Sequence, residues 1–202
     1  MPARSPKFVR AQEGATTVEF VVLFVGFIAL MFFVVELTVY VFFLATLEKA
    51  AEAGVRVAVT SAPVVNLPAT IEPTESARYG DNCNEGSGAC VPFSATPISC
   101  TGPAECSRGD FDRIVAHMQR FNGLIQPDNV TLTYTDVGIG FAGGPPAPMV
   151  TVTVRCVPFR ASVLKLFGID TDNAQDWGCQ HELTEVMLPP RSASMTGEDL
   201  AP

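Results

Sequence analysis

The chain has 202 residues, of which 48% are hydrophobic and only 17% are charged, and its mean hydropathy is +0.27. This composition excludes a disordered chain and is unlike that of an ordinary cytosolic enzyme. Residues 1–14 hold three bases and one acid (+2), whereas the other 188 residues hold ten bases and twenty acids (−10). A basic N-terminus ahead of an acidic body argues against nucleic acid as a partner of the main domain.

Residues 15–59 contain a long apolar segment, which we predict to be one membrane-spanning helix with an amphipathic continuation. No lysine or arginine occurs between Ala11 and Glu48, and Phe20–Val35 carries no charge. As a helix, residues 15–47 would be about 50 Å long, against a hydrocarbon core of about 30 Å. Because basic residues precede the segment, the positive-inside rule predicts a cytoplasmic N-terminus and a C-terminal domain across the membrane.

A cleavable secretory signal is the competing interpretation of this segment. Its apolar region normally spans about 7–15 residues and ends at a pair of small residues. Here the apolar run from Phe20 to Leu47 comprises 27 residues besides Glu36, and no such cleavage site ends it. A membrane anchor is therefore favoured.

Two carboxylates mark the ends of the apolar segment. Glu19 and Glu36 are 17 residues apart, which corresponds to about 25 Å of helix. If one lies near one face of the membrane, the other lies near the opposite face. The simplest interpretation is that both side chains reach the lipid headgroups, where an acid is tolerated.

The residues around Glu19 read Gly14-Ala15-Thr-Thr-Val-Glu19-Phe20 and follow the basic leader. Glu36 stands near the far end of the apolar run, and an alanine-rich amphipathic stretch ends in Gly-Val-Arg56. This arrangement resembles the TadE-like family, a group of pilin-like proteins that serve the tight-adherence (Flp) type IV pilus machinery. The resemblance covers residues 13–58 closely and the rest of the chain only in outline.

The resemblance implies that residues 1–14 are a prepilin leader, which a prepilin peptidase removes by cutting between Gly14 and Ala15. Glycine suits such a site because the backbone can approach a protease closely. Glu19 would then pair with the new N-terminal amine of a neighbouring subunit, since an acid in an apolar bundle needs a partner. Glu36 would be a second assembly residue.

By the same resemblance, the chain would be a minor pilin or pseudopilin in a bacterial inner membrane, acting in assembly of a pilus for adhesion and biofilm formation. Its partners would be the peptidase, other pilins and pseudopilins of the machinery, and inner-membrane lipid. Beyond the membrane, an apolar stripe of largely small residues would pack against other helices or seat the outer domain. The stripe comprises Leu44, Leu47, Ala50, Ala51, Gly54, Val55 and Ala58.

Residues 60–109 form a connecting region rich in proline, glycine and cysteine, with four of the six cysteines. An even number of cysteines in a translocated domain indicates disulfides, but six cysteines permit 15 pairings. Proximity along the chain favours Cys83–Cys90, Cys100–Cys106 and Cys156–Cys179. A zinc site is the alternative, although there is no C-x-x-C and both histidines, His117 and His181, lie far from the four clustered cysteines.

Residues 110–188 are predicted to be an extracytoplasmic α+β domain of the type IV pilin kind, with a small antiparallel sheet. Ser107 and Asp110 resemble a capping box, followed by a helix with one apolar face (Phe111, Ile114, Val115, Met118 and Phe121). Alternation predicts strands over 130–135 and 150–154, joined by a glycine- and proline-rich loop. A short apolar helix or loop at 159–167 and a strand at 180–188 follow, and 189–202 is predicted to be a flexible tail.

The sequence shows no set of residues that supports catalysis, and it points to no metal, cofactor or small-molecule substrate. Residues 138–143 match G-x-G-x-x-G, but prolines follow where a nucleotide-binding helix would begin, so a hairpin loop is expected. His117 and His181 are expected to be structural. Two other classes stay open: an uncleaved membrane-anchored binding domain without a pilus role, and an anchored envelope enzyme.

Overall fold

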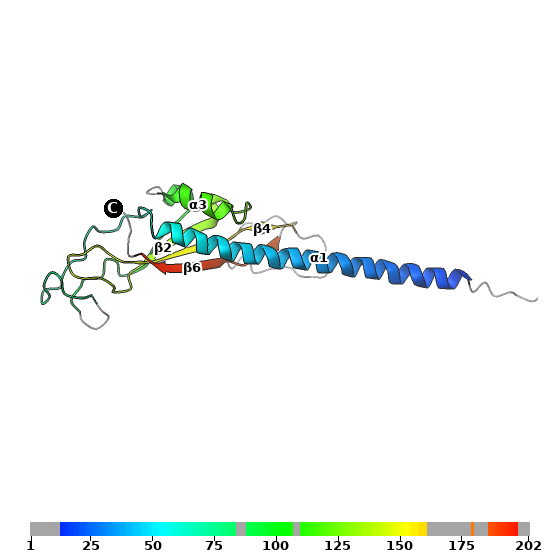
Figure 1. The fold of residues 1–202 in the computed structure, drawn as a ribbon, viewed down its shortest axis with the longest axis horizontal. Coiled ribbons are helices and arrows are strands. Elements are labelled where there is room, and N and C mark those ends of the chain that lie inside the picture. The colour runs from blue at the N-terminus through cyan, green and yellow to red at the C-terminus, as the bar shows by residue number, and fades with distance from the viewer. Residues whose placement is uncertain (1–12, 84–87, 107–109, 161–178, 180–185, 198–202) are drawn as a thin grey trace, which may run out of the picture.

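The computed structural model describes residues 13–83, 88–106, 110–160, 179 and 186–197. Its dominant element is α1 (Glu13–Ala58), a helix of 46 residues, which corresponds to about 69 Å. The N-terminal part of α1 projects away from a domain that is packed around its C-terminal part (Figure 1). The predicted α+β class, with a long apolar helix followed by an antiparallel sheet domain with disulfides, is confirmed.

The domain is built on a four-stranded antiparallel sheet with the strand order β1-β2-β3-β6. Its strands are β1 (Ile98–Thr101), β2 (Val130–Thr135), β3 (Met149–Val154) and β6 (Arg191–Thr196). A two-stranded sheet pairs β4 (Pro158–Phe159) with β5 (Val186–Met187). The short helices among the described residues are α2 (Gly102–Glu105), α3 (Phe111–Gln119) and the 3₁₀ turn η1 (Pro127–Asn129).

The hairpin predicted from alternation is confirmed, because β2 and β3 pair with Leu132 opposite Val152. Valine, leucine and tyrosine side chains of these strands are fully buried on one face, and threonines occupy the other. The glycine-rich segment at 138–143 lies in the loop between the two strands, as expected. The buried face packs against α1, which also contacts α3 and β6.

The prediction of a flexible tail from residue 189 is wrong for residues 191–196, which form the edge strand β6 along the whole length of β3. Ala193 packs against the core, and Ser194 lies on the polar face, where its hydroxyl is 2.8 Å from that of Thr151. An edge strand needs few apolar side chains, because backbone hydrogen bonds to one neighbour hold it and polar residues protect its free edge.

The boundary predicted between residues 109 and 110 does not separate two structural units. The region 60–109 supplies β1 to the central sheet, and its Val64, Cys100 and Cys106 are part of the main core. The three disulfides are Cys83–Cys90, Cys100–Cys106 and Cys156–Cys179, the pairs that proximity along the chain predicts.

Several local expectations are corrected around the helix and the last strands. Phe121 is 51% exposed, because α3 ends at Gln119 and Phe121 no longer follows the helical face. Asp110 occupies the N-cap position without a side-chain cap and instead pairs with Arg113 at 3.3 Å; Ser107 lies outside the described residues. Phe159, predicted to begin a short helix or loop, lies in the strand β4. The strand predicted at 180–188 is seen at Val186–Met187, which form β5. Residues 161–167 and 180–185 lie outside the described residues.

Candidate functional site

The N-terminal half of α1, here called its membrane-proximal half, is apolar and is not covered by the domain. Within the described part of the chain, α1 is the one helix long and apolar enough to cross a membrane, and none of its most apolar window is buried. Phe20 is 66% exposed and Leu23 is 73% exposed. Such a surface is unfavourable in water and suits lipid or other helices, so it is consistent with a single-pass membrane anchor.

The residues predicted to be processed and to guide assembly lie at the start of this helix. Gly14 and Ala15 are in the first turns of α1, and Glu19 follows about one turn later with an exposed side chain. The first backbone N–H groups of a helix have no partner within it, so this end of α1 is the part that opens most easily. Gly14, Ala15 and Glu19 therefore lie close together along one helix end, whereas Glu36 is separated from them.

Glu36 lies beside a groove at the base of the domain, on the side from which α1 projects. The groove has a volume of about 720 Å³, which is within the range typical of ligand sites. Its walls are residues of α1 on one side and residues of the α3–η1 loop and β4 on the other: Phe32, Val35, Glu36, Val39, Phe43, Leu124, Pro158, Phe159 and Arg160. Glu36 is half-buried there.

The apolar stripe on the second half of α1 is covered by the domain itself. Leu47, Ala50 and Ala51 are at most 1% exposed and belong to the main core. Gly54 lies so close to α3 that an added Cβ would be 2.7 Å from the Sδ of Met118. The small residues thus allow α1 and α3 to pack closely within one chain. This part of the helix packs into the domain and is not open to a second helix.

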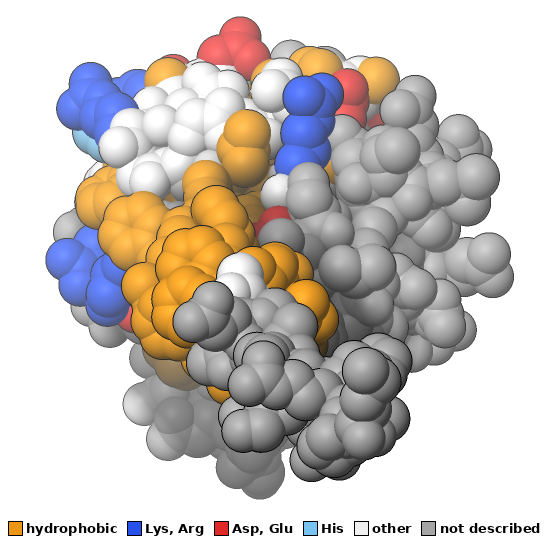
Figure 2. Space-filling view, turned by 90° about the vertical axis from the view of Figure 1, so that its right-hand side faces the viewer, with side chains coloured by type: hydrophobic (Ala, Val, Ile, Leu, Met, Phe, Trp, Pro, Cys, Tyr) orange, Lys and Arg blue, Asp and Glu red, His pale blue; other side chains and the backbone are white. Residues whose placement is uncertain are grey.

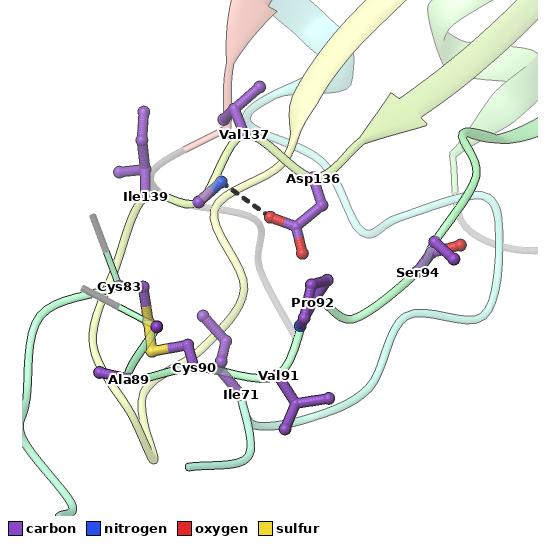
Figure 3. Close-up of a pocket in the computed structure, with 13 residues that line it drawn as sticks. Ile71, Cys83, Ala89, Cys90, Val91, Pro92, Ser94, Asp136, Val137 and Ile139 are labelled. Atoms are coloured by element: carbon purple, nitrogen blue, oxygen red, sulfur yellow. Dashed lines mark hydrogen bonds between the residues drawn. A yellow bond between two sulfur atoms is a disulfide. The ribbon is translucent and has the colours of Figure 1, made fainter. Parts of the chain in front are cut away.

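The end of the domain farthest from the projecting helix holds a second cavity, of about 400 Å³, beside the Cys83–Cys90 disulfide (Figure 3). Asp136 lies on its wall, and its carboxylate accepts hydrogen bonds from the backbone N–H groups of Gly138 at 2.9 Å and Phe93 at 2.8 Å. The carboxylate therefore holds two loops together. Asp136 is the one acidic or basic side chain among the described residues that line this cavity.

The structure brings together no group of three or more histidine, cysteine or acidic side chains suited to a metal ion among the described residues. His117 lies in the last turn of α3 and is half-buried. His181 is outside the described residues. The cysteines are joined in disulfides.

Sequence reasoning missed the groove, because Leu124 and Arg160 are separated by 36 residues and meet α1 only in the fold. Leu124 is 39% exposed and lies in a loop, where no periodic pattern of apolar residues marks it in the sequence. The one available signal was the position of Glu36 within an apolar run, which marked this level of α1 as unusual.

A family model described as TadE-like protein matches residues 14–56. No curated protein and no solved structure matches the chain. The matched segment coincides with almost the whole of α1, from the glycine at the predicted processing site to the arginine in its last turn. Over residues 14–56, its N-terminal helix, the chain is therefore similar to TadE-like proteins.

Proposed function

We infer that this protein is a minor pilin or pseudopilin of the tight-adherence pilus machinery, freed by a prepilin peptidase and assembled through its N-terminal helix. The observation that carries this proposal is the exposed apolar half of α1, headed by Gly14-Ala15 and Glu19. The match of the TadE-like family to the same helix supports it. The proposal includes a cytoplasmic N-terminus and a bacterial inner-membrane location.

The cut between Gly14 and Ala15 would change the charge at the head of the helix. It removes a leader with a net charge of +2 and leaves an ammonium on Ala15. Glycine lowers the cost of unwinding the first turn into the extended form that a protease binds, because glycine is a poor helix former. Removal of the leader creates the amine that would pair with Glu19 of a neighbouring subunit.

Glu19 would select the register in which one helix docks beside the next. An ionised carboxylate in an apolar bundle is strongly destabilised unless a positive group pairs with it. The N-terminal amine of a neighbour is such a group, and it lies within reach only when the two helices are aligned. The second half of α1 is already covered by the domain, so assembly contacts of the helix would be confined to its membrane-proximal half.

A matched set of glutamine variants tests this role. Glu19→Gln should lower the amount of protein in sheared pilus fractions at least about tenfold, the effect of losing about 1.4 kcal/mol of docking free energy. Glu48→Gln, an exposed acid on the domain half of the same helix, is the control and should leave the amount unchanged. If Glu19→Gln behaves like Glu48→Gln, the uncleaved membrane-anchored binding domain becomes the better interpretation.

An enzyme is the remaining class, and histidine chemistry is its simplest form. The proposal uses no catalysis, so replacing His117 and His181 together should leave pilus assembly and adhesion unchanged. A loss of either phenotype, with the protein still present in the membrane at its normal level, would contradict the non-catalytic proposal.

A further inference from the structure

The base of the domain lies at the depth where α1 leaves the membrane. A hydrocarbon core of about 30 Å that begins after Glu19 takes about twenty residues of helix and ends near residue 40, and the headgroup layer extends about four residues farther. The ring of Phe159 is 5.7 Å from that of Tyr40 and 5.4 Å from that of Phe43, measured between centroids. The folded domain therefore begins inside the headgroup layer, without a spacer.

Two arginines stand at this level. Arg160 is exposed and lines the groove together with Glu36 and Leu124. Arg191, at the start of β6, is close enough to Tyr40 for its charge to act on the tyrosine hydroxyl. Among the described residues, two arginines and one carboxylate stand at this level, although residues 15–202 as a whole carry a net charge of −10.

Arg191 also has a buried donor without an acceptor. Among the described residues, its Nε is the one buried side-chain nitrogen or oxygen that makes no hydrogen bond. Buried polar groups are nearly always satisfied in native proteins, so this N–H needs an acceptor that the described residues do not supply. Phosphate oxygens are the acceptors that a guanidinium matches best.

The groove continues from this charged level into the apolar surface of the helix. Phe32 and Val35 of α1 line one side of the groove and are 61% and 56% exposed. Leu124 lines the opposite side. An occupant must be charged at one end and apolar at the other. Figure 2 looks at this end of the molecule and shows a group of apolar side chains with both basic and acidic side chains near it.

We propose that the base of the domain binds anionic phospholipids of the adjoining leaflet, with Arg160 and Arg191 on the headgroup phosphate and the groove along an acyl chain. The binding surface comprises Glu36, Leu124, Phe159, Arg160 and Arg191, and it is continuous with the membrane-spanning face of α1. Bound lipid would hold the domain on the membrane until a pilus neighbour displaces it. The lipid site itself does not depend on the proposed pilus function.

Depth-dependent fluorescence quenching in bilayers tests this proposal on the full-length chain. Trp177 is replaced by phenylalanine, and a single tryptophan is introduced by Leu124→Trp at the base or by Tyr79→Trp in the loops at the far end of the domain, where Tyr79 is 79% exposed. Each variant is reconstituted in phosphatidylcholine with phosphatidylglycerol, and bromine is carried on the acyl chains of one lipid or the other. The variant at position 124 should be quenched, and the variant at position 79 should not.

The identity of the brominated lipid reports selection. Brominated phosphatidylglycerol should quench the tryptophan at position 124 more than brominated phosphatidylcholine at the same mole fraction. Arg160→Gln should lower this enrichment about fivefold, and adding Arg191→Gln should abolish it. Because Arg160 is exposed, the single variant is expected to fold and keeps the test informative if the double variant does not.

Three results would overturn the proposal. Equal quenching at positions 124 and 79 would place the base away from the bilayer. Equal quenching by the two brominated lipids in the chain with both arginines would remove the anionic selection. Loss of quenching at position 124 as protein density rises at fixed lipid composition would assign the surface to a second copy of the chain.

Discussion

Leu47 offers the clearest test of whether α1, besides being the membrane anchor, also forms part of the domain core. It lies on the same helix as the membrane anchor, yet it is 1% exposed and belongs to the main core of the domain. Truncation of a fully buried leucine to alanine costs about 2–5 kcal/mol, because apolar contacts are lost and a cavity remains. Leu47→Ala should therefore destabilise the domain by about 3 kcal/mol, a change of about 100-fold in the ratio of folded to unfolded protein.

Pulse proteolysis in urea measures this effect on the detergent-solubilised full chain. With a denaturant slope of roughly 1.5 kcal/mol per molar, the midpoint should fall by roughly 2 M. Leu30→Ala is the matched control, because Leu30 is 59% exposed on the same helix and touches detergent instead of the core. An unchanged midpoint for Leu47→Ala, equal to that of Leu30→Ala, would refute the conclusion that the second half of α1 is part of the domain core.

Two further predictions concern the same core. Gly54→Val should lower the free energy of unfolding by about 1–3 kcal/mol, because its side chain would collide with the buried Met118. Gly26→Val, at a position with no other atom within 4 Å of an added Cβ, should leave the urea midpoint of the domain unchanged, and equal effects would contradict the packing. Burial raises the pKa of the Tyr134 hydroxyl, which accepts a hydrogen bond from the Val64 N–H at 3.3 Å. Because the unfolded chain releases this proton near pH 10 and the native chain retains it, the stabilisation is complete below pH 10 and is lost as the pH rises further. Tyr134→Phe should cost about 1 kcal/mol at neutral pH. The fall in urea midpoint between about pH 8 and about pH 11 should be smaller in this variant than in the native chain; an identical fall would contradict the role of Tyr134.

The elements that the sequence predicts well are those whose side chains repeat with a clear period. The strands at Val130–Thr135 and Met149–Val154 alternate between buried apolar residues and threonines, and α3 carries its buried residues on one helical face. Proximity along the chain predicted the disulfides for a similar reason, since residues that are closer in sequence are more easily brought together. Local patterns were sufficient in each case.

The features that the sequence did not predict depend on contacts between distant segments. β6 consists mostly of small polar residues, and its strand structure comes from the backbone of β3 and not from its own periodicity. The apolar stripe on α1 indicated a buried face, but it was equally compatible with a second helix and with the chain's own domain. The burial of Leu47 and Ala50 in the core and the close approach of Gly54 to Met118 decide between them. The groove at Glu36 required Leu124 and Arg160 to meet the same helix.

The intact mass and N-terminal sequence of the membrane-purified protein test the central claim most directly, in cells with and without their prepilin peptidase. The proposed function predicts a mature chain that begins at Ala15 when the peptidase is present and a chain that begins at Met1 when it is absent. A start at Met1 in both strains would contradict the proposal and leave an uncleaved membrane anchor carrying an α+β domain.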